Sequence, residues 1–191
     1  GSIGNPLSPD DSGDNGTGAE SRLVNNATYD HGIACIVAAG NDGKRRIASP
    51  GSADGAITIG SADNSDSINR TDDFMASYSN TGPRDSDNDN DDWDELKPDI
   101  TAYGSGIYSA SAATGTSLPG SPRPMADNSY ESKDGTSMAT PLVSGVVALM
   151  LQAESDLTPM EIKDILRNSS ELKGSPSESG VSDRWNDEWG F

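Results

Sequence analysis

The residues best placed to carry out chemistry lie at positions 135–141, which read Gly-Thr-Ser-Met-Ala-Thr-Pro and lead directly into the apolar run 142–151. Apolar residues in that run recur at spacings of three and four, which predicts a helix buried nearly all round. Ser137 then lies where a turn becomes a helix, and the free amides of a first helical turn carry a partial positive charge. A serine there can attack a carbonyl carbon while nearby N–H groups stabilise the developing oxyanion.

A second candidate is Asn41, which follows the apolar run 33–39 in the turn Gly40-Asn41-Asp42-Gly43. The run is rich in β-branched residues and predicts a strand buried on both faces of a parallel sheet. Sites in open α/β sheets form at the carboxyl ends of strands, so Asn41 is expected at such an end. Its side-chain amide can donate a hydrogen bond to an oxyanion.

Both segments resemble those of the subtilisin-like serine proteases, the subtilases. Residues 135–141 match the family's nucleophile motif G-T-S-M-A-x-P, and residues 38–41 resemble its A-A-G-N stretch. The resemblance implies that Ser137 is the nucleophile and that the Asn41 amide helps to form the oxyanion hole. It also implies a three-layer α/β fold, with a mainly parallel sheet flanked by helices, and a chemistry that requires no cofactor.

The start of the chain resembles a substrate-binding strand of the same family. Its residues Ser-Ile-Gly match the pattern S-x-G, and subtilases pair this strand with the backbone of an extended substrate, a form of β-augmentation. The resemblance therefore implies a protein or peptide substrate in extended conformation. The residues implied in binding it are Ser2, Ile3, Gly4, Ala39 and Gly40.

The remaining elements must position these residues. The pattern predicts a helix over about residues 20–30 and a strand over 56–59. Thr158, Pro159 and Glu161 predict the start of another helix, with a capping box between Thr158 and Glu161. Residues 97–102 resemble the subtilase strand that reads K-P-D-x-x-A.

A serine nucleophile of this type needs a histidine base and an aspartate that orients it. The chain has a single histidine, His31, which leads into the predicted strand rather than a helix, so neither His31 nor Asp30 is expected in a triad. In subtilases the aspartate and histidine motifs precede the S-x-G strand, which here begins at residue 2. We therefore expect residues 1–191 to be the C-terminal portion of a catalytic domain that lacks its N-terminal portion. That portion is the expected partner, and the chain alone is expected to be inactive.

The charge balance limits the other partners. With 31 acidic and 13 basic side chains the formal net charge is −18, which repels nucleic acid and anionic membranes, and no run of residues is expected to span a membrane. The acidic composition favours a high-salt or marine source, and the family resemblance implies secretion. The lone cysteine, Cys35, is expected in the core. Sheet surface that the missing portion would cover is expected to favour self-association.

Two polar insertions are expected, at about residues 84–96 and about 111–133. Ca²⁺ prefers many oxygen ligands, and the first insertion contains alternating aspartates at Asp85, Asp87, Asp89 and Asp91. The pattern is not an EF-hand, because Asn90 stands where that loop requires glycine. A structural calcium loop and a solvated acidic insertion both stay open.

Two functions are consistent with these features. The first is a serine endopeptidase of subtilisin type, with Ser137 as nucleophile and Asn41 as oxyanion donor. The alternative is a non-catalytic, calcium-dependent binding or scaffold domain with a subtilase fold, which would depend on the acidic insertion. The presence of D-[ST]-G and H-G-T-H motifs upstream of this chain would favour the first.

Overall fold

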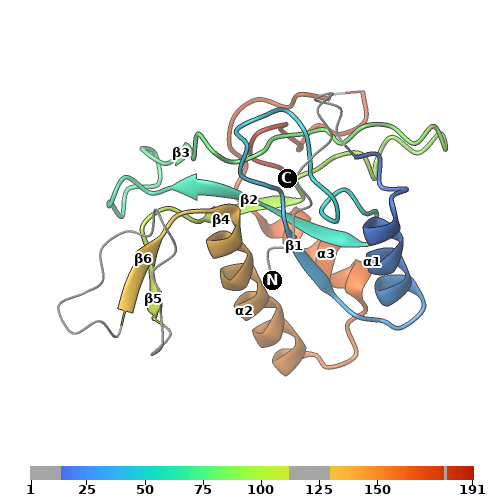
Figure 1. Cartoon of the computed structure of the whole chain (residues 1–191), viewed down its shortest axis with the longest axis horizontal. Coiled ribbons are helices and arrows are strands. Elements are labelled where there is room, and N and C mark those ends of the chain that lie inside the picture. Colours follow the sequence, from blue (N-terminus) through green and yellow to red (C-terminus); the bar gives the residue numbers. More distant parts are fainter. Residues whose placement is uncertain (1–13, 112–129, 179) are drawn as a thin grey trace.

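A computed structural model gives the structure of residues 14–111, 130–178 and 180–191. Within these ranges the secondary structure follows the sequence signals closely (Figure 1). The helices are α1 (Ala19–Tyr29), α2 (Thr136–Ala153) and α3 (Pro159–Ser169). The strands are β1 (Cys35–Ala38), β2 (Ala56–Asp63), β3 (Phe74–Met75), β4 (Ile100–Tyr103), β5 (Ile107–Ala110) and β6 (Tyr130–Lys133).

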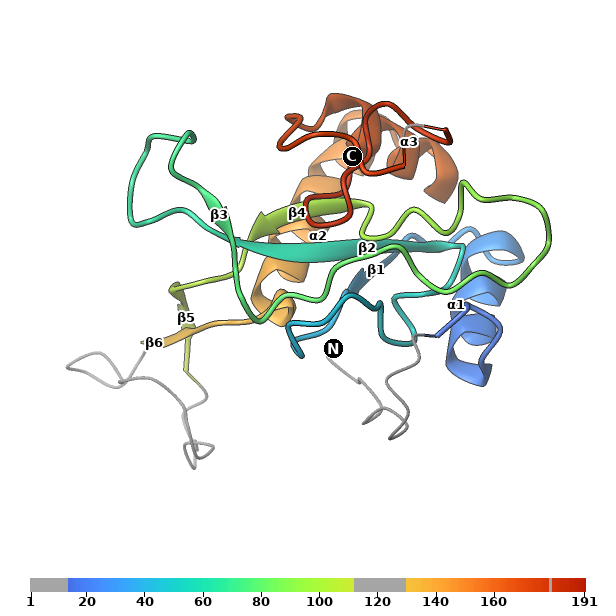
Figure 2. The ribbon, with the colours of Figure 1, turned by 90° about the horizontal axis from the view of Figure 1, so that it is seen from above.

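The central sheet is mainly parallel. Strand β2 pairs in parallel with β1 on one side, where Cys35 faces Ala56, and with β4, where Ile59 faces Ile100. The short β3 pairs antiparallel with the end of β2. Figure 2 shows α2 passing behind the sheet, with α3 beside it, and α1 next to the amino end of β2. The chain therefore has the expected α/β architecture, a mainly parallel sheet flanked by helices.

The main core lies between the sheet and helices α2 and α3. Ile57 and Ile59 alternate along β2 with Thr58, so that the two isoleucines share one face. Burying each such aliphatic side chain stabilises the fold by about 1.5–3 kcal/mol. The cluster consists of Ile57, Ile59, Ile100, Ala139, Val143, Val147, Ile162 and Leu166.

Helix α3 begins as its sequence predicts. Thr158 Oγ1 accepts a hydrogen bond from the Glu161 amide at 3.3 Å, and Glu161 Oε2 accepts one from the Thr158 amide at 2.8 Å. The pair forms the predicted capping box, with Pro159 at the first helical position. The box satisfies amides that the helix itself leaves without partners.

A buried carboxylate ties β2, β4 and α3 together. Asp99 is fully buried, and its oxygens accept from the Thr58 amide at 2.6 Å, from Lys97 Nζ at 3.0 Å and from Arg167 Nε at 2.8 Å. Lys163 Nζ lies 3.6 Å away. Burial alone raises the pKa of this carboxyl, but the Lys163, Lys97 and Arg167 cations together hold it well below its usual range. Asp99 is therefore ionised under all ordinary conditions.

The serine-bearing helix is less buried than predicted. Leu142, Val146 and Leu149 are 45%, 47% and 66% exposed, while Val143 and Val147 face the core. Strand β1, with Cys35, is also only half-buried. The prediction of burial all round was wrong for the described residues, because within them the sheet and α3 pack against one side of α2. Pro141 lies in the second turn of α2.

Helix α2 also corrects the expectation that no segment could span a membrane. Its 18 residues have a mean hydropathy of 1.4, which by length and composition alone is enough. The helix contacts β1, β2 and β4, however. A single helix of this kind is weak evidence of a membrane span, because helices of soluble folds can pass the same test.

The second polar insertion is partly a strand. Residues 130–133 form β6, which pairs antiparallel with β5 so that Tyr108 faces Ser132. The predicted loop over about 111–133 was therefore wrong at its end; residues 112–129 lie outside the described residues. None of the eight residues of the two strands is fully buried, and neither strand alternates apolar with polar residues in a way that would reveal it in the sequence.

Candidate active site

Ser137 is the second residue of α2 and is half-buried. The preceding Gly135 has φ of +151°, a conformation that favours glycine over other residues. Its amide donates to the Gly104 carbonyl at 2.9 Å and to the Tyr78 hydroxyl at 3.1 Å. The turn that presents Ser137 is therefore fixed from two sides.

The loop after β1 reaches the same turn. Asn41 Oδ1 accepts hydrogen bonds from the Thr136 amide at 2.8 Å and from the Thr136 hydroxyl at 2.9 Å. Because Oδ1 is used in this way, Asn41 presents its Nδ2 donor on the other side. A Cβ built on Gly135 would lie 3.4 Å from Nδ2. The structure thus places Asn41 against Thr136, the residue before Ser137, at the start of α2.

A cavity opens beside the nucleophile. It has a volume of about 280 Å³ and lies between α2 and β1. Its lining residues are Ile36, Val37, Ala38, Pro50, Ser137, Thr140, Pro141 and Ser144. Ser137 therefore has free space around it rather than a closed core.

The predicted substrate-binding residues divide into two groups. Ala39 is buried and Gly40 is half-buried, and both directly precede Asn41. A Cβ on Gly40 would lie 3.4 Å from the Ala48 side chain, so Ala48 lines the same region. Ser2, Ile3 and Gly4 lie outside the described residues.

His31 lies far from the nucleophile. It is exposed in the turn between α1 and β1, at the amino end of β1, whereas Asn41 follows the carboxyl end. The four residues of β1 alone separate these ends by about 13 Å. Since the chain has one histidine, it provides no imidazole that could take the proton of Ser137.

Two supporting residues carry no signal in the sequence. The Tyr78 hydroxyl, which accepts from Gly135, also shares hydrogen bonds with Ser61 Oγ at 2.9 Å and Ser105 Oγ at 3.0 Å. Asn80 is fully buried, and its Oδ1 accepts from the Asp42 amide at 2.8 Å. Both lie in a loop between β3 and β4 whose composition resembles any polar turn. Only the fold reveals that they surround the site.

The alternating aspartates make a series of local turns. Asp87 Oδ1 accepts from the Asp89 amide at 3.2 Å, Asp89 Oδ1 from the Asp91 amide at 2.7 Å and Asp91 Oδ1 from the Trp93 amide at 3.0 Å. An aspartate that bonds an amide two residues on forms an Asx turn. These hydrogen bonds to the backbone account for the aspartate at every second position. The structure does not gather Asp85, Asp87, Asp89 and Asp91 into one cluster.

A different group of acidic oxygens does converge. Among the described residues, ligand atoms of Asp54, Asp87 and Asp94 lie within 4.8 Å of one another. The buried Arg84 guanidinium lies among them, with Nη2 at 3.0 Å, 3.4 Å and 2.6 Å from the three carboxylates. Burial and the neighbouring Asp54 raise the pKa of Asp94 to about 6, although Arg84 opposes this. The arginine provides the positive charge that a cation would otherwise supply.

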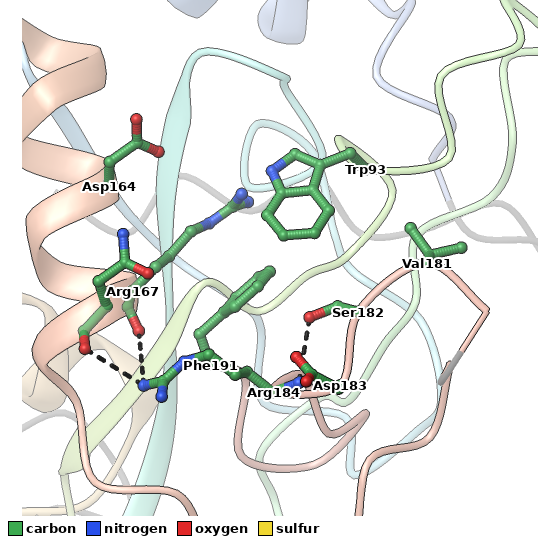
Figure 3. Close-up of a pocket in the computed structure, with 9 residues that line it drawn as sticks. Trp93, Asp164, Arg167, Val181, Ser182, Asp183, Arg184 and Phe191 are labelled. Atoms are coloured by element: carbon green, nitrogen blue, oxygen red, sulfur yellow. Dashed lines mark hydrogen bonds between the residues drawn. The ribbon is translucent and has the colours of Figure 1, made fainter.

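A second cavity, of about 400 Å³, lies between α3, the acidic segment (the first polar insertion, at about residues 84–96) and the end of the chain (Figure 3). The Arg167 guanidinium carbon lies 4.4 Å from the centre of the Phe191 ring and 5.7 Å from that of Trp93. Arg167 also binds Asp99, and Arg184 Nη2 donates to carbonyls at the end of α3. Both cations are thus engaged within the protein, and we assign no chemistry to this cavity.

The arrangement around Ser137 has two of the parts that acyl transfer requires. It offers a hydroxyl at the amino end of a helix and, in Asn41, a side-chain amide held against the same helical turn. The one histidine of the chain, His31, lies at the opposite end of β1.

Comparison with known proteins shows which family the chain resembles. The model of the Subtilase family matches residues 1–191. Serine protease AprX of Bacillus subtilis (strain 168) is 37% identical over 161 residues, which are 82% of this chain and 32% of that protein. An extracellular protease of Xanthomonas campestris pv. campestris is 33% identical, over 76% of this chain and 21% of that protein. The chain therefore spans less than a third of these two relatives.

A solved structure also resembles this chain. A protease from Pseudoalteromonas arctica PAMC 21717 superposes with a TM-score of 0.57 at 31% identity, and the match covers 78% of this chain and 39% of that one. This similarity, the match of the family model over all 191 residues and the geometry around Ser137 agree with one another. The chain belongs to the subtilase family.

Proposed function

We propose that this chain supplies the nucleophile and the oxyanion hole of a serine endopeptidase of subtilisin type. A base from outside this chain takes the Ser137 hydroxyl proton as Oγ attacks the scissile carbonyl carbon, and the carbonyl electron pair moves to its oxygen. Asn41 Nδ2 and the Ser137 amide donate to that oxygen. Collapse of the intermediate breaks the C–N bond, and the base gives its proton to the leaving amine. The acyl-serine that is left is then hydrolysed by water, which regenerates the Ser137 hydroxyl. The observation that carries the proposal is the Asn41–Thr136 contact, which fixes the amide donor beside the serine.

The base and its aspartate come from outside this chain in our proposal, from an N-terminal portion of the same catalytic domain. Two observations support this partner. The single histidine lies at the wrong end of β1. In addition, apolar side chains of α2 are exposed on one arc, including Leu142 and Val146. An apolar arc beside a nucleophile is a surface that further chain would cover.

The substrate proposed is a protein or peptide in extended conformation, bound beside Ala39 and Gly40 and paired with Ser2, Ile3 and Gly4. Secretion is supported by relatives such as the extracellular protease of Xanthomonas. The net charge of −18 is consistent with a high-salt or marine setting and disfavours nucleic acid as a partner.

The alternative, a calcium-dependent scaffold domain, has weaker support. It needs acidic side chains that are left without positive charge, and the converging carboxylates of Asp54, Asp87 and Asp94 already surround Arg84. A structural calcium ion at the acidic segment stays a prediction. No observation in the described residues favours this function over catalysis.

The proposal is tested by substitution in the full-length protein, with hydrolysis of an extended peptide amide as the readout. Ser137→Ala should abolish the turnover that depends on the acyl-serine. Asn41→Ala should lower kcat by about 10²–10³, the loss established for the corresponding asparagine of subtilisin, with little change in KM. Ser144→Ala is the matched control, because Ser144 lines the same cavity and its hydroxyl only bonds the Thr140 carbonyl. Undiminished hydrolysis by the Ser137→Ala variant would refute the proposal.

A further inference from the structure

One residue outside the site controls the loop that carries the oxyanion donor. Asn80 belongs to the segment between β3 and β4 and is fully buried. Its Oδ1 accepts from the Asp42 amide at 2.8 Å and from the Lys44 amide at 3.4 Å. The backbone amide of Asn80 donates to the Gly40 carbonyl at 3.0 Å. Asn80 thus bonds the backbone on both sides of Asn41.

The backbone before Asn41 is shaped by the same side chain. Gly40 has φ of +115°, and a Cβ there would collide with the Asn80 amide nitrogen. The loop therefore lies directly against Asn80, with no room for a side chain between them. Because Asn80 is 38 residues from Asp42 in sequence, this restraint is tertiary and does not arise from the turn itself.

The position of Asn41 matters as well as its presence. An oxyanion donor acts only if it lies about 2.7–3.1 Å from the developing charge, and a displacement of about 1 Å can cost about 10² in rate. Among the described residues, Asn41 is held from α2 by its bonds to Thr136. Backbone bonds also hold its loop, from the Gly43 amide to the Tyr78 carbonyl at 2.8 Å and from the Thr81 amide to the Lys44 carbonyl at 3.0 Å. The Asn80 side chain adds the bond to the Asp42 amide, directly beside Asn41.

We propose that Asn80 is a positioning residue for the oxyanion hole. Its side-chain carbonyl fixes the Asp42 and Lys44 amides, and this fixes the direction of the Asn41 amide. The inference rests on the proposed function of Ser137 and Asn41. Asn80 touches neither substrate nor nucleophile and acts through Asn41 only.

The test is a double-mutant cycle in the full-length protein, with kcat and KM measured on an extended peptide amide. Asn80→Leu keeps the size of the side chain and removes the acceptor. We expect kcat to fall by about 10–10² and KM to stay within about twofold. In the Asn41→Ala background the same substitution should change kcat by less than about threefold, because the donor that Asn80 positions is gone.

A matched control separates positioning from loss of stability. Thr28→Val removes a buried hydroxyl that bonds the backbone carbonyls of Ile33 and Gly55 on the far side of the sheet. It should lower the melting temperature without changing kcat. Additive effects of Asn80→Leu and Asn41→Ala on kcat would overturn the proposal, as would an unchanged kcat in Asn80→Leu. A normal kcat in Asn41→Ala would instead refute the proposed function.

A second measurement does not depend on activity. Hydrogen exchange of the peptide over residues 38–46 reports the Asp42 and Lys44 amides directly. Exchange should be faster in the Asn80→Leu variant and unchanged in Thr28→Val. Unaltered exchange in Asn80→Leu would overturn the proposal even if kcat fell.

Discussion

The buried Asp99 permits a sharp test of what holds the scaffold together. The substitution Asp99→Asn keeps the size of the side chain and removes the negative charge. Three cations, Lys97, Lys163 and Arg167, would then lie buried or nearly buried with no counter-charge at the position of this carboxylate. Asp99 also accepts from the Thr58 amide, so the substitution weakens the contact between β4 and β2.

The expected loss follows from the number of groups that depend on one carboxylate. Removing one partner of a buried ion pair costs about 3–5 kcal/mol, because the remaining charge stays buried and unpaired. Burial lowers the pKa of Lys97 and Lys163, so in the variant these lysines can lose a proton, and the loss stays within the range for one pair, about 3–5 kcal/mol. In a domain of this size each kcal/mol lowers the melting temperature by about 2–4 °C. The variant should therefore melt about 6–20 °C below the wild type.

Urea unfolding of the full-length protein measures this loss, and Asp164→Asn is the control because Asp164 is exposed on α3. The pH dependence has a defined sign. The folded pKa of Asp99 lies below its unfolded value, so its contribution is complete above about pH 4 and is lost as the pH falls through the folded pKa. A loss below about 1 kcal/mol at neutral pH would refute the reasoning, because a loss that small is typical of an exposed ion pair, which contributes little to the free energy of unfolding.

Two further predictions concern charge and association. Because the folded pKa of Asp94 is raised to about 6, the contribution of this group to the stability of the wild type falls as the pH rises from about 4 to 6. The stability of Asp94→Asn relative to wild type should therefore increase by about 1–3 kcal/mol across that range, measured by urea unfolding at each pH; a flat difference would contradict it. The exposed arc of α2 should cause the isolated chain to self-associate. Replacing Leu142 and Val146 by serine should lower its sedimentation coefficient, whereas an unchanged value would exclude this surface.

The sequence predicts the elements whose signals are local. The apolar spacing after Ser137, the β-branched run before Asn41 and the capping box at Thr158 each depend on residues within a few positions of one another. Each of these elements is present in the structure. The fold then brings Asn41 to Thr136 across 95 positions, which the resemblance to subtilases implies and local patterns alone do not.

The remaining features depend on contacts that a sequence pattern does not specify. Asn80 and Tyr78 act on loops far away in the chain. Whether the apolar arc of α2 is exposed depends on what packs beside the helix. The residue sequence of the helix is the same in either case and therefore does not reveal it. The alternating aspartates illustrate an ambiguity of chemistry. Carboxylate oxygens that suit Ca²⁺ also suit backbone amides two residues on, and in this structure they bond the amides.

The central claim is that Ser137 is the nucleophile of a site whose base lies outside this chain. Labelling with a fluorophosphonate probe, followed by intact-mass and peptide mapping, tests it most directly, since the probe reacts with an activated serine. The full-length protein and the isolated chain are compared side by side under the same conditions. We predict labelling of Ser137 in the full-length protein and none in the isolated chain. Rapid labelling of Ser137 in the isolated chain would contradict the account.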